Sequence, residues 1–347
     1  IAHFGMQILS LSGINAMAIG TLGVSALDRT YDVNFVTTTP SYIELRKIFF
    51  KYGHNYEVIF LEASSHGLKQ DRFFDINFDH IIWTNLGYDH MDYHFNREDY
   101  FNSKLKIVNL LKKNGKLLIH SGEYDLIKKI EMQTEIDVFK VNDFCFTKKD
   151  LVPMFLKTYF NKINLSIVSE ILNILFPTKI DINKIINKIS PPDGRFNIIN
   201  YKKYTVIIDF AHTPDAFESV MRSVQEEFKS SRIISLFGCG GNRDSQKRKI
   251  MGEISSKYSD FLYLTSDNPR FEDSMKIINE IQTGVKDCGY EIIENRKEAI
   301  KTSIKKIKEG DILLILGKGH ECYQDIMGKK YPLIEKYSLK ELIMYGI

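Results

Sequence analysis

Short apolar runs alternate with amphipathic stretches along almost the whole chain. Strands that alternate with helices are typical of βαβ units, so the pattern predicts an α/β fold with mostly parallel sheets covered on both faces. Pro40 suits a first helical turn and Gly53 suits the C-terminal end of the same helix. In the first part we predict strands near 15–20, 32–37, 56–62, 80–86 and 116–120, and helices near 1–12, 40–52, 97–112 and 165–176.

The alternation is interrupted by the cluster Ser190-Pro191-Pro192-Asp193-Gly194, whose prolines cannot continue a helix. We predict a boundary there, between a domain over residues 1–194 and a second domain over residues 195–347. The second part has the pattern of a smaller Rossmann-like domain. Its predicted strands lie near 204–210, 232–237, 260–265 and 311–316, and its helices near 214–228, 245–258, 273–287 and 296–308.

Composition narrows the possible functions. The chain has 347 residues, 44% of them apolar, and 47 Lys and Arg against 44 Asp and Glu, with no basic stripe that would predict nucleic-acid binding. No apolar run approaches the ~18 residues of a membrane span and no signal peptide precedes the first strand, so we expect a cytoplasmic protein without membrane insertion. Four cysteines lack paired or zinc-type spacing, which predicts free thiols. The chain opens at Ile1 inside an amphipathic pattern, so we expect a fragment.

Polar side chains follow two predicted strands of the first domain. Glu62 and the segment to Gly67 end one strand, and Asp89, His90, Asp92 and His94 follow the next. Ligands bind at this edge of parallel sheets, and Glu62 with His90 could hold Mg²⁺. A helix cap with a turn explains the first segment equally well. The pattern around Lys104, on the following helix, indicates only a solvent-exposed face of that helix.

Four strand ends of the second domain also carry polar residues. Asp209 to Asp215 joins a strand to a helix, with Thr213 as cap and Pro214 in the first turn, where an anion or a ribose could bind. Taken singly, the segment from Asp209 to Asp215 and each of the other three strand ends could also be explained as a turn. Three further strand ends deliver cations and polar groups to one rim, where a carboxylate or phosphate would suit them: Arg243, Arg270, Lys318, His320 and Glu321.

These motifs together closely resemble one family, the Mur ligases, and within it the UDP-N-acetylmuramoyl-tripeptide synthetases that add meso-diaminopimelate. The resemblance runs through nearly the whole chain and implies a central ATPase-type domain, truncated at its N-terminus, plus a C-terminal Rossmann-like domain. The matching segments are Thr38-Thr39-Pro40, 62–72, 84–94, 209–215, 239–244, Asp267-Asn268-Pro269-Arg270 and Gly317-Lys318-Gly319-His320-Glu321.

The resemblance also implies residue roles. Glu62 and His90 would bind Mg²⁺, and Lys104 would be a carbamylated lysine that helps to position the metal. The nucleotide, ATP, would contact Arg195, Asp209 and His212. The partner substrate UDP-N-acetylmuramoyl-dipeptide would be held by Thr38, Thr39, Ser64, Gln70 and Arg72. The incoming amino acid would be bound by Arg243, Asp267, Asn268, Pro269, Arg270, Gly317 and Glu321.

Charge distinguishes the candidate amino acids. Meso-diaminopimelate carries an ammonium and a carboxylate at its far end, whereas lysine lacks that carboxylate. Arg243 and Arg270 can bind a carboxylate while Glu321 takes the ammonium, and Arg270 would lack an anion if lysine were bound. The alternatives are a lysine-adding synthetase, a folylpolyglutamate synthetase-like ligase, and an inactive fragment that only binds a ligand or a partner protein.

The resemblance implies a reaction through an acyl phosphate, formed when the D-Glu γ-carboxylate attacks the γ-phosphate of ATP. The amine of diaminopimelate then displaces phosphate. Two departures from the family pattern stand out. The glycine-rich P-loop and the uridine-binding domain expected before Ile1 do not occur in the sequence, so we expect poor ATP binding and no activity from these residues alone. Gly87-Tyr88 also stands where relatives commonly have Thr-Arg.

Overall fold

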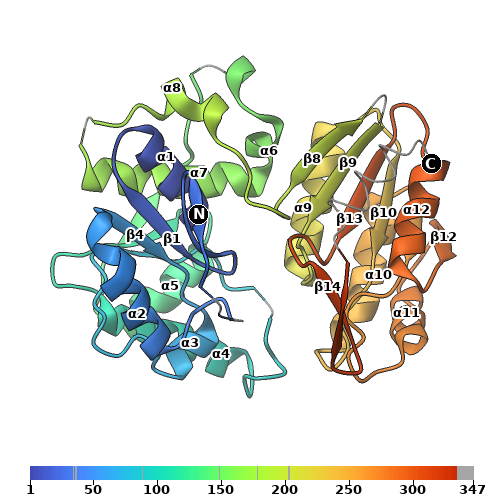
Figure 1. Ribbon diagram of the computed structural model, residues 1–347, viewed down its shortest axis with the longest axis horizontal. Helices are drawn as coiled ribbons and strands as arrows, with labels where there is room; N and C mark the ends of the chain where they lie inside the picture. Colours follow the sequence, from blue (N-terminus) through green and yellow to red (C-terminus); the bar gives the residue numbers. More distant parts are fainter. Residues whose placement is uncertain are drawn as a thin grey trace. The chain divides into compact units, whose positions relative to one another are not determined.

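A computed structural model describes residues 1–33, 35, 37–87, 89–147, 149–177, 179–201 and 204–333 (Figure 1). The chain forms two compact units. Unit 1 contains Ile1–Gly87 and Tyr93–Ser190, and unit 2 contains Tyr88–Asp92 and Pro191–Ile347. The division after Ser190 falls close to the expected boundary, although the assignment of residues 1–194 and 195–347 to two functional domains remains a prediction. No helix among the described residues is long and apolar enough to cross a membrane.

The first sheet of unit 1 has four strands in the order β3-β2-β1-β4. β1 pairs in parallel with β4, whereas β2 and β3 form an antiparallel ribbon on its other side. Gly5 of α1 lets that helix approach the sheet, because a Cβ there would lie 2.4 Å from the Phe60 ring. The elements are α1 (Ala2–Leu11), β1 (Ala16–Gly20), β2 (Gly23–Ala26), β3 (Arg29–Tyr31), α2 (Tyr42–Tyr52) and β4 (Val58–Leu61).

Two local predictions in this sheet were wrong. Pro40 does not lie in the first turn of α2, since the helix is capped by Ser41, which forms a capping box with Glu44. No strand covers 32–37 in its described residues, and Asn34 and Val36 lie outside them. Gly53 does follow the last residue of α2, as the pattern predicts.

The second sheet of unit 1 is parallel, with the order β5-β6-β7. Its core contains Trp83, Phe101, Leu117 and Ile127, so α4 and α5 pack against these strands. The longest helix, α7, begins six residues before its expected start. The elements are α3 (Ser65–Lys69), β5 (Ile81–Ile82), α4 (Arg97–Leu105), β6 (Leu117–His120), α5 (Tyr124–Gln133), β7 (Val138–Val141), α6 (Met154–Lys157), α7 (Tyr159–Leu175) and α8 (Ile182–Ile185).

Unit 2 is built on a six-stranded sheet in the order β12-β11-β10-β13-β9-β8, parallel except for β8. β10 and β13 are buried along their whole length, as expected of strands covered on both faces. The elements are β8 (Asn197–Tyr201), β9 (Tyr204–Asp209), α9 (Pro214–Glu227), β10 (Ile233–Phe237), α10 (Gln246–Tyr258), β11 (Phe261–Leu264), α11 (Ser274–Gln282), β12 (Gly289–Ile292), α12 (Arg296–Lys306) and β13 (Ile312–Leu316).

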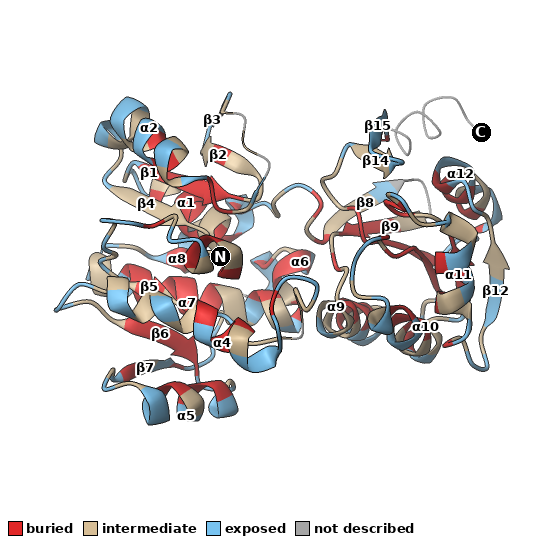
Figure 2. Ribbon diagram, turned by 90° about the horizontal axis from the view of Figure 1, so that it is seen from below, coloured by how far each residue is buried: buried red, intermediate tan, exposed pale blue. Residues whose placement is uncertain are grey.

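The strand order explains where the helices of unit 2 lie. From β9 the chain moves outward through β10 and β11 to β12, then returns to place β13 between β10 and β9. Because parallel crossovers are right-handed, the returning helix α12 covers the opposite face from α9 and α10 (Figure 2). The loops after β9, β10, β11 and β13 therefore share one sheet edge, and the hairpin β14 (Tyr323–Ile326) and β15 (Lys329–Pro332) follows β13. The predicted α/β class is confirmed.

Candidate functional site

A pocket of about 170 Å³ opens at the carboxyl edge of the unit 2 sheet. Four strand-end loops line it, together with the segment 89–92, which belongs to the same unit. The pocket therefore brings together predicted residues from five separate motifs, as expected of an open α/β sheet. Its lining residues are Asp89, His90, Asp92, Phe210, His212, Gly238, Cys239, Gly240, Arg243, Asp244, Lys247, Asp267, Asn268, Arg270, Gly317 and Glu321.

Asp209, at the end of β9, is buried and bonded to the backbone. Its two carboxylate oxygens accept hydrogen bonds from the backbone N–H groups of Phe196 and Ala211, both at 2.7 Å. Burial raises the pKa of Asp209, although Arg195 opposes this effect. The Arg195 guanidinium lies over the Phe210 ring, 4.6 Å from its centre. Asp209 thus organises the turn around the predicted nucleotide contacts.

His212 follows on the same turn and is partly buried. Its Nδ1 lies 2.9 Å from the Phe210 carbonyl oxygen, and Lys247 Nζ donates to the His212 carbonyl at 3.0 Å. Burial, assisted by the charge of Lys247, lowers the pKa of His212. Pro214 occupies the first turn of α9 as expected, but Thr213 at the cap position makes no side-chain capping bond. The lowered pKa favours a neutral His212 imidazole at neutral pH, and Lys247 contacts the backbone of the same residue.

The loops after β10 and β11 are joined through Arg270. Its Nη1 donates to the Gly241 carbonyl at 2.7 Å, and the Gly241 N–H donates to the Asn268 carbonyl at 2.9 Å. The Arg270 backbone has φ of +52°, a left-handed conformation uncommon for a residue with a side chain. Backbone bonds to Asp325 and Met327 of the hairpin hold it there. The sequence pattern did not predict this hairpin.

Arg243 is the second predicted carboxylate ligand at the pocket. Its Nη1 forms an ion pair with Asp92 Oδ2, so the guanidinium already has one anionic partner. Burial opposes ionisation of Asp92, but the hydrogen bond and the charge of Arg243 outweigh it and lower the pKa of that carboxyl. A carboxylate that reached Arg243 would share or replace this contact.

Lys318 is fully buried beneath the pocket rather than exposed on its rim. Its ammonium donates to Asn268 Oδ1 at 3.0 Å and to Glu321 Oε2 at 2.7 Å. Asn268 Nδ2 donates to the same oxygen of Glu321 at 2.9 Å. Glu321 therefore has a cationic partner in the structure, and Lys318 fixes its orientation toward the pocket.

The rest of the predicted amino-acid motif packs tightly behind these groups. Asp267 is buried, and its Oδ1 accepts a bond from the Asn268 N–H at 2.6 Å. Gly317 has φ of +107°, and a Cβ there would lie 2.9 Å from Asp267 Oδ2. The Pro269 carbonyl accepts a bond from the Glu272 N–H at 3.0 Å. Only glycine meets both demands at position 317.

Glu62 occupies the corresponding strand end in unit 1. Its Oε2 accepts bonds from the N–H and the hydroxyl of Thr21, both at 2.8 Å. A Cβ at Gly20 would lie 2.3 Å from the Glu62 Cδ, so the absence of a side chain at position 20 makes room for the carboxylate. Thr21 also bonds Thr38 at 3.1 Å. Sequence reasoning did not identify Gly20, the last residue of β1, or Thr21, which follows it at the same sheet edge.

The five residues expected to bind the nucleotide sugar lie close together. Thr39 Oγ1 donates to the Glu62 carbonyl and accepts from the Ser64 N–H, at 2.8 and 2.9 Å. Arg72 bonds the Thr39 carbonyl, and its Nη2 donates to Gln70 Oε1 at 2.7 Å. Gln70 and Arg72 line a pocket of about 590 Å³ beside α2. Ser64 caps α3 by accepting a bond from the Gly67 N–H, so the structural explanation of this turn is also correct.

The predicted metal ligands are distributed over both units. Glu62 and Lys104 belong to unit 1, and His90 belongs to unit 2. Lys104 lies on α4 with Nζ 5.2 Å from the Tyr100 ring centre, and His90 has φ of +61° and an Nε2 3.4 Å from Asp89 Oδ2. Within the described part of the chain, no three His, Cys, Asp or Glu side chains are grouped as a metal site. The assignment of these three residues as metal ligands therefore remains a prediction.

His94, singled out with the loop before α4, has a structural role. It is buried, with Nε2 2.9 Å from Ser65 Oγ and Nδ1 3.4 Å from Asp99 Oδ2. Asp99 also accepts a bond from Lys69 at 2.6 Å. These contacts tie α3 to α4, and both the serine and the histidine are too buried for a substrate to reach them.

Comparison with known proteins gives two family matches that together span most of the chain. The Mur ligase middle domain matches residues 1–201, and the Mur ligase glutamate ligase domain matches residues 194–319. A protein of Clostridium acetobutylicum named UDP-N-acetylmuramoyl-L-alanyl-D-glutamate–2,6-diaminopimelate ligase 1 is 36% identical over 97% of this chain and 74% of its own length.

Solved structures have the same architecture. A UDP-N-acetylmuramoyl-L-alanyl-D-glutamate–2,6-diaminopimelate ligase superposes with a TM-score of 0.61 and 25% identity, covering 99% of this chain and 76% of that one. A bifunctional folylpolyglutamate synthase/dihydrofolate synthase from Yersinia pestis, complexed with AMPPNP and a manganese ion, has a TM-score of 0.68 over 90% of this chain and 82% of its own. At 13% identity the second likeness concerns the fold alone.

Proposed function

The chain belongs to the Mur ligase family, and from that premise we propose that it joins meso-diaminopimelate to UDP-N-acetylmuramoyl-L-alanyl-D-glutamate at the expense of ATP, in peptidoglycan synthesis. The observation that carries the proposal is the convergence of Arg243, Arg270 and Glu321 on one pocket of unit 2. Two cations and one anion match the carboxylate and ammonium at the far end of meso-diaminopimelate.

Charge balance favours diaminopimelate over lysine at this pocket. Arg270 makes a neutral contact with the Gly241 carbonyl, which leaves its positive charge to be matched by a substrate carboxylate. Glu321 can accept a bond from the substrate ammonium while it keeps its bonds to Lys318 and Asn268. Lysine would supply the ammonium but no carboxylate, so the guanidinium would remain uncompensated in a partly buried site.

The other substrate and ATP are proposed to bind through residues of both units. Thr38, Thr39, Ser64, Gln70 and Arg72 would hold UDP-N-acetylmuramoyl-dipeptide, because they form one bonded cluster beside Glu62. Arg195, Asp209 and His212 would contact the nucleotide from unit 2. Arg195 already stacks on an aromatic ring, and an aromatic and guanidinium surface suits a base or a phosphate.

We propose that the divalent cation is Mg²⁺ and that Glu62 is its main ligand on this chain. Glu62 offers a carboxylate, the preferred ligand type, in the space that Gly20 leaves open. His90 and Lys104, the latter as its carbamate, would complete the protein's contribution. When bound, the cation would offset the negative charge of the ATP phosphates.

In the proposed reaction, residues of this chain position the two substrates for two successive steps. The cluster around Thr39 and Arg72 would orient the dipeptide so that its γ-carboxylate attacks the γ-phosphate, which forms an acyl phosphate and releases ADP. Arg243, Arg270 and Glu321 would hold the far end of diaminopimelate so that its amine attacks the acyl carbon. Phosphate then leaves and the amide bond remains. Positioning and electrostatics supply most of the catalysis in such reactions.

Amino-acid-dependent phosphate release from the full-length protein tests the proposal. With ATP, Mg²⁺ and UDP-N-acetylmuramoyl-dipeptide present, we expect turnover with meso-diaminopimelate and little with lysine or glutamate. Turnover with lysine alone would identify a lysine-adding synthetase, and turnover with glutamate on a folate would identify a folylpolyglutamate synthetase-like ligase. Tight binding of the nucleotide sugar without turnover would indicate a binding protein.

A further inference from the structure

Behind the pocket, unit 2 contains a buried arginine to which no role has been assigned. We propose that Arg248, through Glu272, is a positioning residue that fixes the loops of Arg243 and Arg270 relative to one another and thereby sets selectivity for the far carboxylate of the amino acid. The inference rests on the proposed function, since it concerns the same amino-acid pocket.

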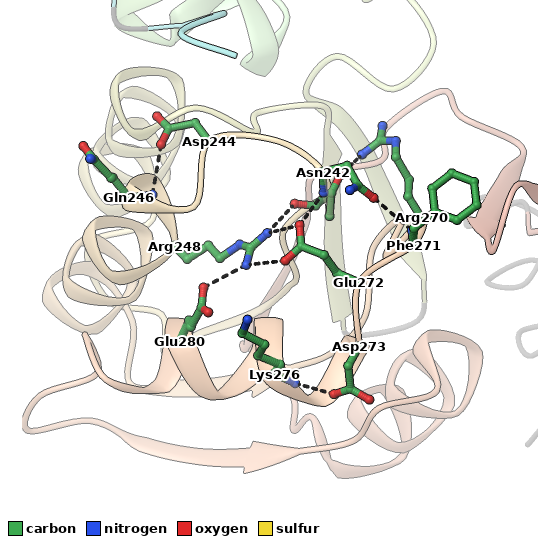
Figure 3. A network of polar contacts seen from close by, with 12 residues as sticks. Asn242, Asp244, Gln246, Arg248, Arg270, Phe271, Glu272, Asp273, Lys276 and Glu280 are labelled. Carbon is green, nitrogen blue, oxygen red and sulfur yellow. Dashed lines mark hydrogen bonds and ion pairs between the residues drawn. The ribbon is translucent and has the colours of Figure 1, made fainter.

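Arg248 lies on α10 and is only 1% exposed. Its two terminal nitrogens donate to the two oxygens of Glu272, each at 3.0 Å, which is a bidentate pair (Figure 3). Nη1 also donates to Glu280 Oε2 at 2.8 Å, and Nη2 to the Gly240 carbonyl at 3.3 Å. One guanidinium therefore contacts the loop after β10 directly and the loop after β11 through a carboxylate.

Glu272 extends the connection back to the first loop. Its Oε1 accepts a bond from the Asn242 N–H, and Asn242 Oδ1 accepts a bond from the Phe271 N–H at 2.9 Å (Figure 3). Asn242 precedes Arg243, and Phe271 follows Arg270. The two arginines that line the pocket are therefore each one residue away from a bond that links the loops.

The loops are also in direct backbone contact. A Cβ at Gly241 would lie 1.9 Å from the Pro269 carbonyl oxygen, and Arg270 itself donates to the Gly241 carbonyl. Asn242 and Arg270 both have positive φ, 51° and 52°, so neither adopts its most favourable backbone conformation. The bond from Asn242 N–H to Glu272 holds the loop of Asn242, whereas backbone bonds to the hairpin hold the Arg270 backbone. The Arg270 guanidinium donates to Gly241 in the loop of Asn242, so it should shift when Glu272 no longer fixes that loop.

A buried ion pair is a weak source of stability, because desolvation offsets most of the attraction between the charges. Well-packed apolar side chains would serve the core equally well. The bidentate geometry does provide a fixed distance and direction between α10 and both loops. Glu272 keeps a lowered pKa, since its bond to Arg248 favours the charged form. The network therefore stays ionised at neutral pH and holds one loop geometry.

Glu280 provides a matched control. It lies on α11 and accepts a bond from the same guanidinium, but this bond joins it to Arg248 and not to either pocket loop. Its replacement should cost similar stability without disturbing Asn242 or Arg270. A role in packing alone predicts the same effect for Glu272→Gln and Glu280→Gln, whereas a positioning role predicts different effects.

The test compares wild type, Glu272→Gln, Glu280→Gln and Arg248→Lys in the full-length enzyme. We expect Glu272→Gln and Arg248→Lys to raise KM for diaminopimelate about 10- to 100-fold, which is the effect of losing one hydrogen bond to a charged group. The ratio of kcat/KM for diaminopimelate to kcat/KM for lysine should fall as a result. KM for ATP and for the dipeptide substrate, and kcat, should change less than about 3-fold. Glu280→Gln should leave KM for diaminopimelate within about 2-fold of wild type at a comparable loss in Tm.

Equal KM shifts in the two glutamate variants, or wild-type KM in Glu272→Gln, would overturn the inference. Absence of diaminopimelate turnover in the wild type would instead overturn the proposed function. Crystal structures of the variants then decide the geometry without reference to activity. The inference expects the Arg270 guanidinium to shift in Glu272→Gln but not in Glu280→Gln, and an unmoved guanidinium in both would contradict it.

Discussion

Replacement of Arg270 by alanine should abolish useful activity with diaminopimelate. The backbone at this position should survive the change, because its bonds to Asp325 and Met327 involve no side-chain atom. The left-handed φ of +52° burdens alanine about as much as arginine. The structure therefore predicts a folded variant that lacks one guanidinium at the pocket.

The magnitude follows from two separate losses. The side-chain bond to the Gly241 carbonyl is a single contact, worth about 1–2 kcal/mol to folding. The charge-assisted contact to the substrate carboxylate is worth more, about 3–4 kcal/mol when its partner is left partly buried. Converted at 1.4 kcal/mol per factor of ten, the second loss lowers kcat/KM for diaminopimelate about 100- to 1000-fold. With lysine, which has no far carboxylate, kcat/KM should change less than about 5-fold.

Steady-state phosphate release with each amino acid measures this effect, and thermal unfolding of the variant checks that it remains folded. Arg270→Lys is the matched variant, because it keeps the charge and loses the planar fork; it should retain about a tenth of the diaminopimelate activity. Near-normal use of diaminopimelate by a folded Arg270→Ala variant would refute the charge argument.

Three further substitutions test other parts of the account. Gly20→Ala should displace the Glu62 carboxylate, lower stability by about 1–3 kcal/mol and lower kcat, whereas Gly53→Ala, with 3.7 Å to its nearest neighbour, should do neither; equal effects in urea unfolding and kinetics would contradict this. His212 has a lowered pKa, so as pH falls below about 6.5 the unfolded chain binds its proton first and stability should fall. His212→Asn should flatten the dependence of Tm on pH in that range, and an unchanged profile would argue against a neutral imidazole in the folded protein. Lys318→Met leaves the Glu321 carboxylate without its cationic partner and should lower the free energy of unfolding by about 2–3 kcal/mol. This is less than the ~3–5 kcal/mol expected for a fully buried pair, because the Glu321 side chain is 22% exposed; a Tm equal to that of the wild type would contradict the pairing.

Much of the fold follows from local sequence. The apolar runs that become β9, β10, β11 and β13 are fully or nearly fully buried, so their hydrophobicity alone identifies them. The missed strands are edge elements or exposed ribbons. β15 is exposed at every residue, and β12 begins with glycine at the edge of the sheet, so neither carries an apolar signal. Pairing with a neighbour, which sequence periodicity does not encode, defines these strands.

The candidate site was predictable only in part. Residues at strand ends, such as Glu62 and Arg270, could be found because the carboxyl edge of a parallel sheet is where ligands bind. The residues that contact these side chains could not be predicted in this way. Lys318 was expected on the rim and is fully buried, and Asp92 contacts Arg243 across 151 positions of the chain. Arg248 lies on a helix where charged residues usually face solvent, and only the fold shows it to be enclosed.

The central claim is that the pocket of unit 2 selects an amino acid with a carboxylate at its far end. Full-length protein supplied with ATP, Mg²⁺, UDP-N-acetylmuramoyl-dipeptide and equal concentrations of meso-diaminopimelate and lysine tests it directly, with the UDP-linked product identified by mass spectrometry. The account predicts a product that contains diaminopimelate almost exclusively. A product that contains lysine, or an equal mixture of the two, would contradict it.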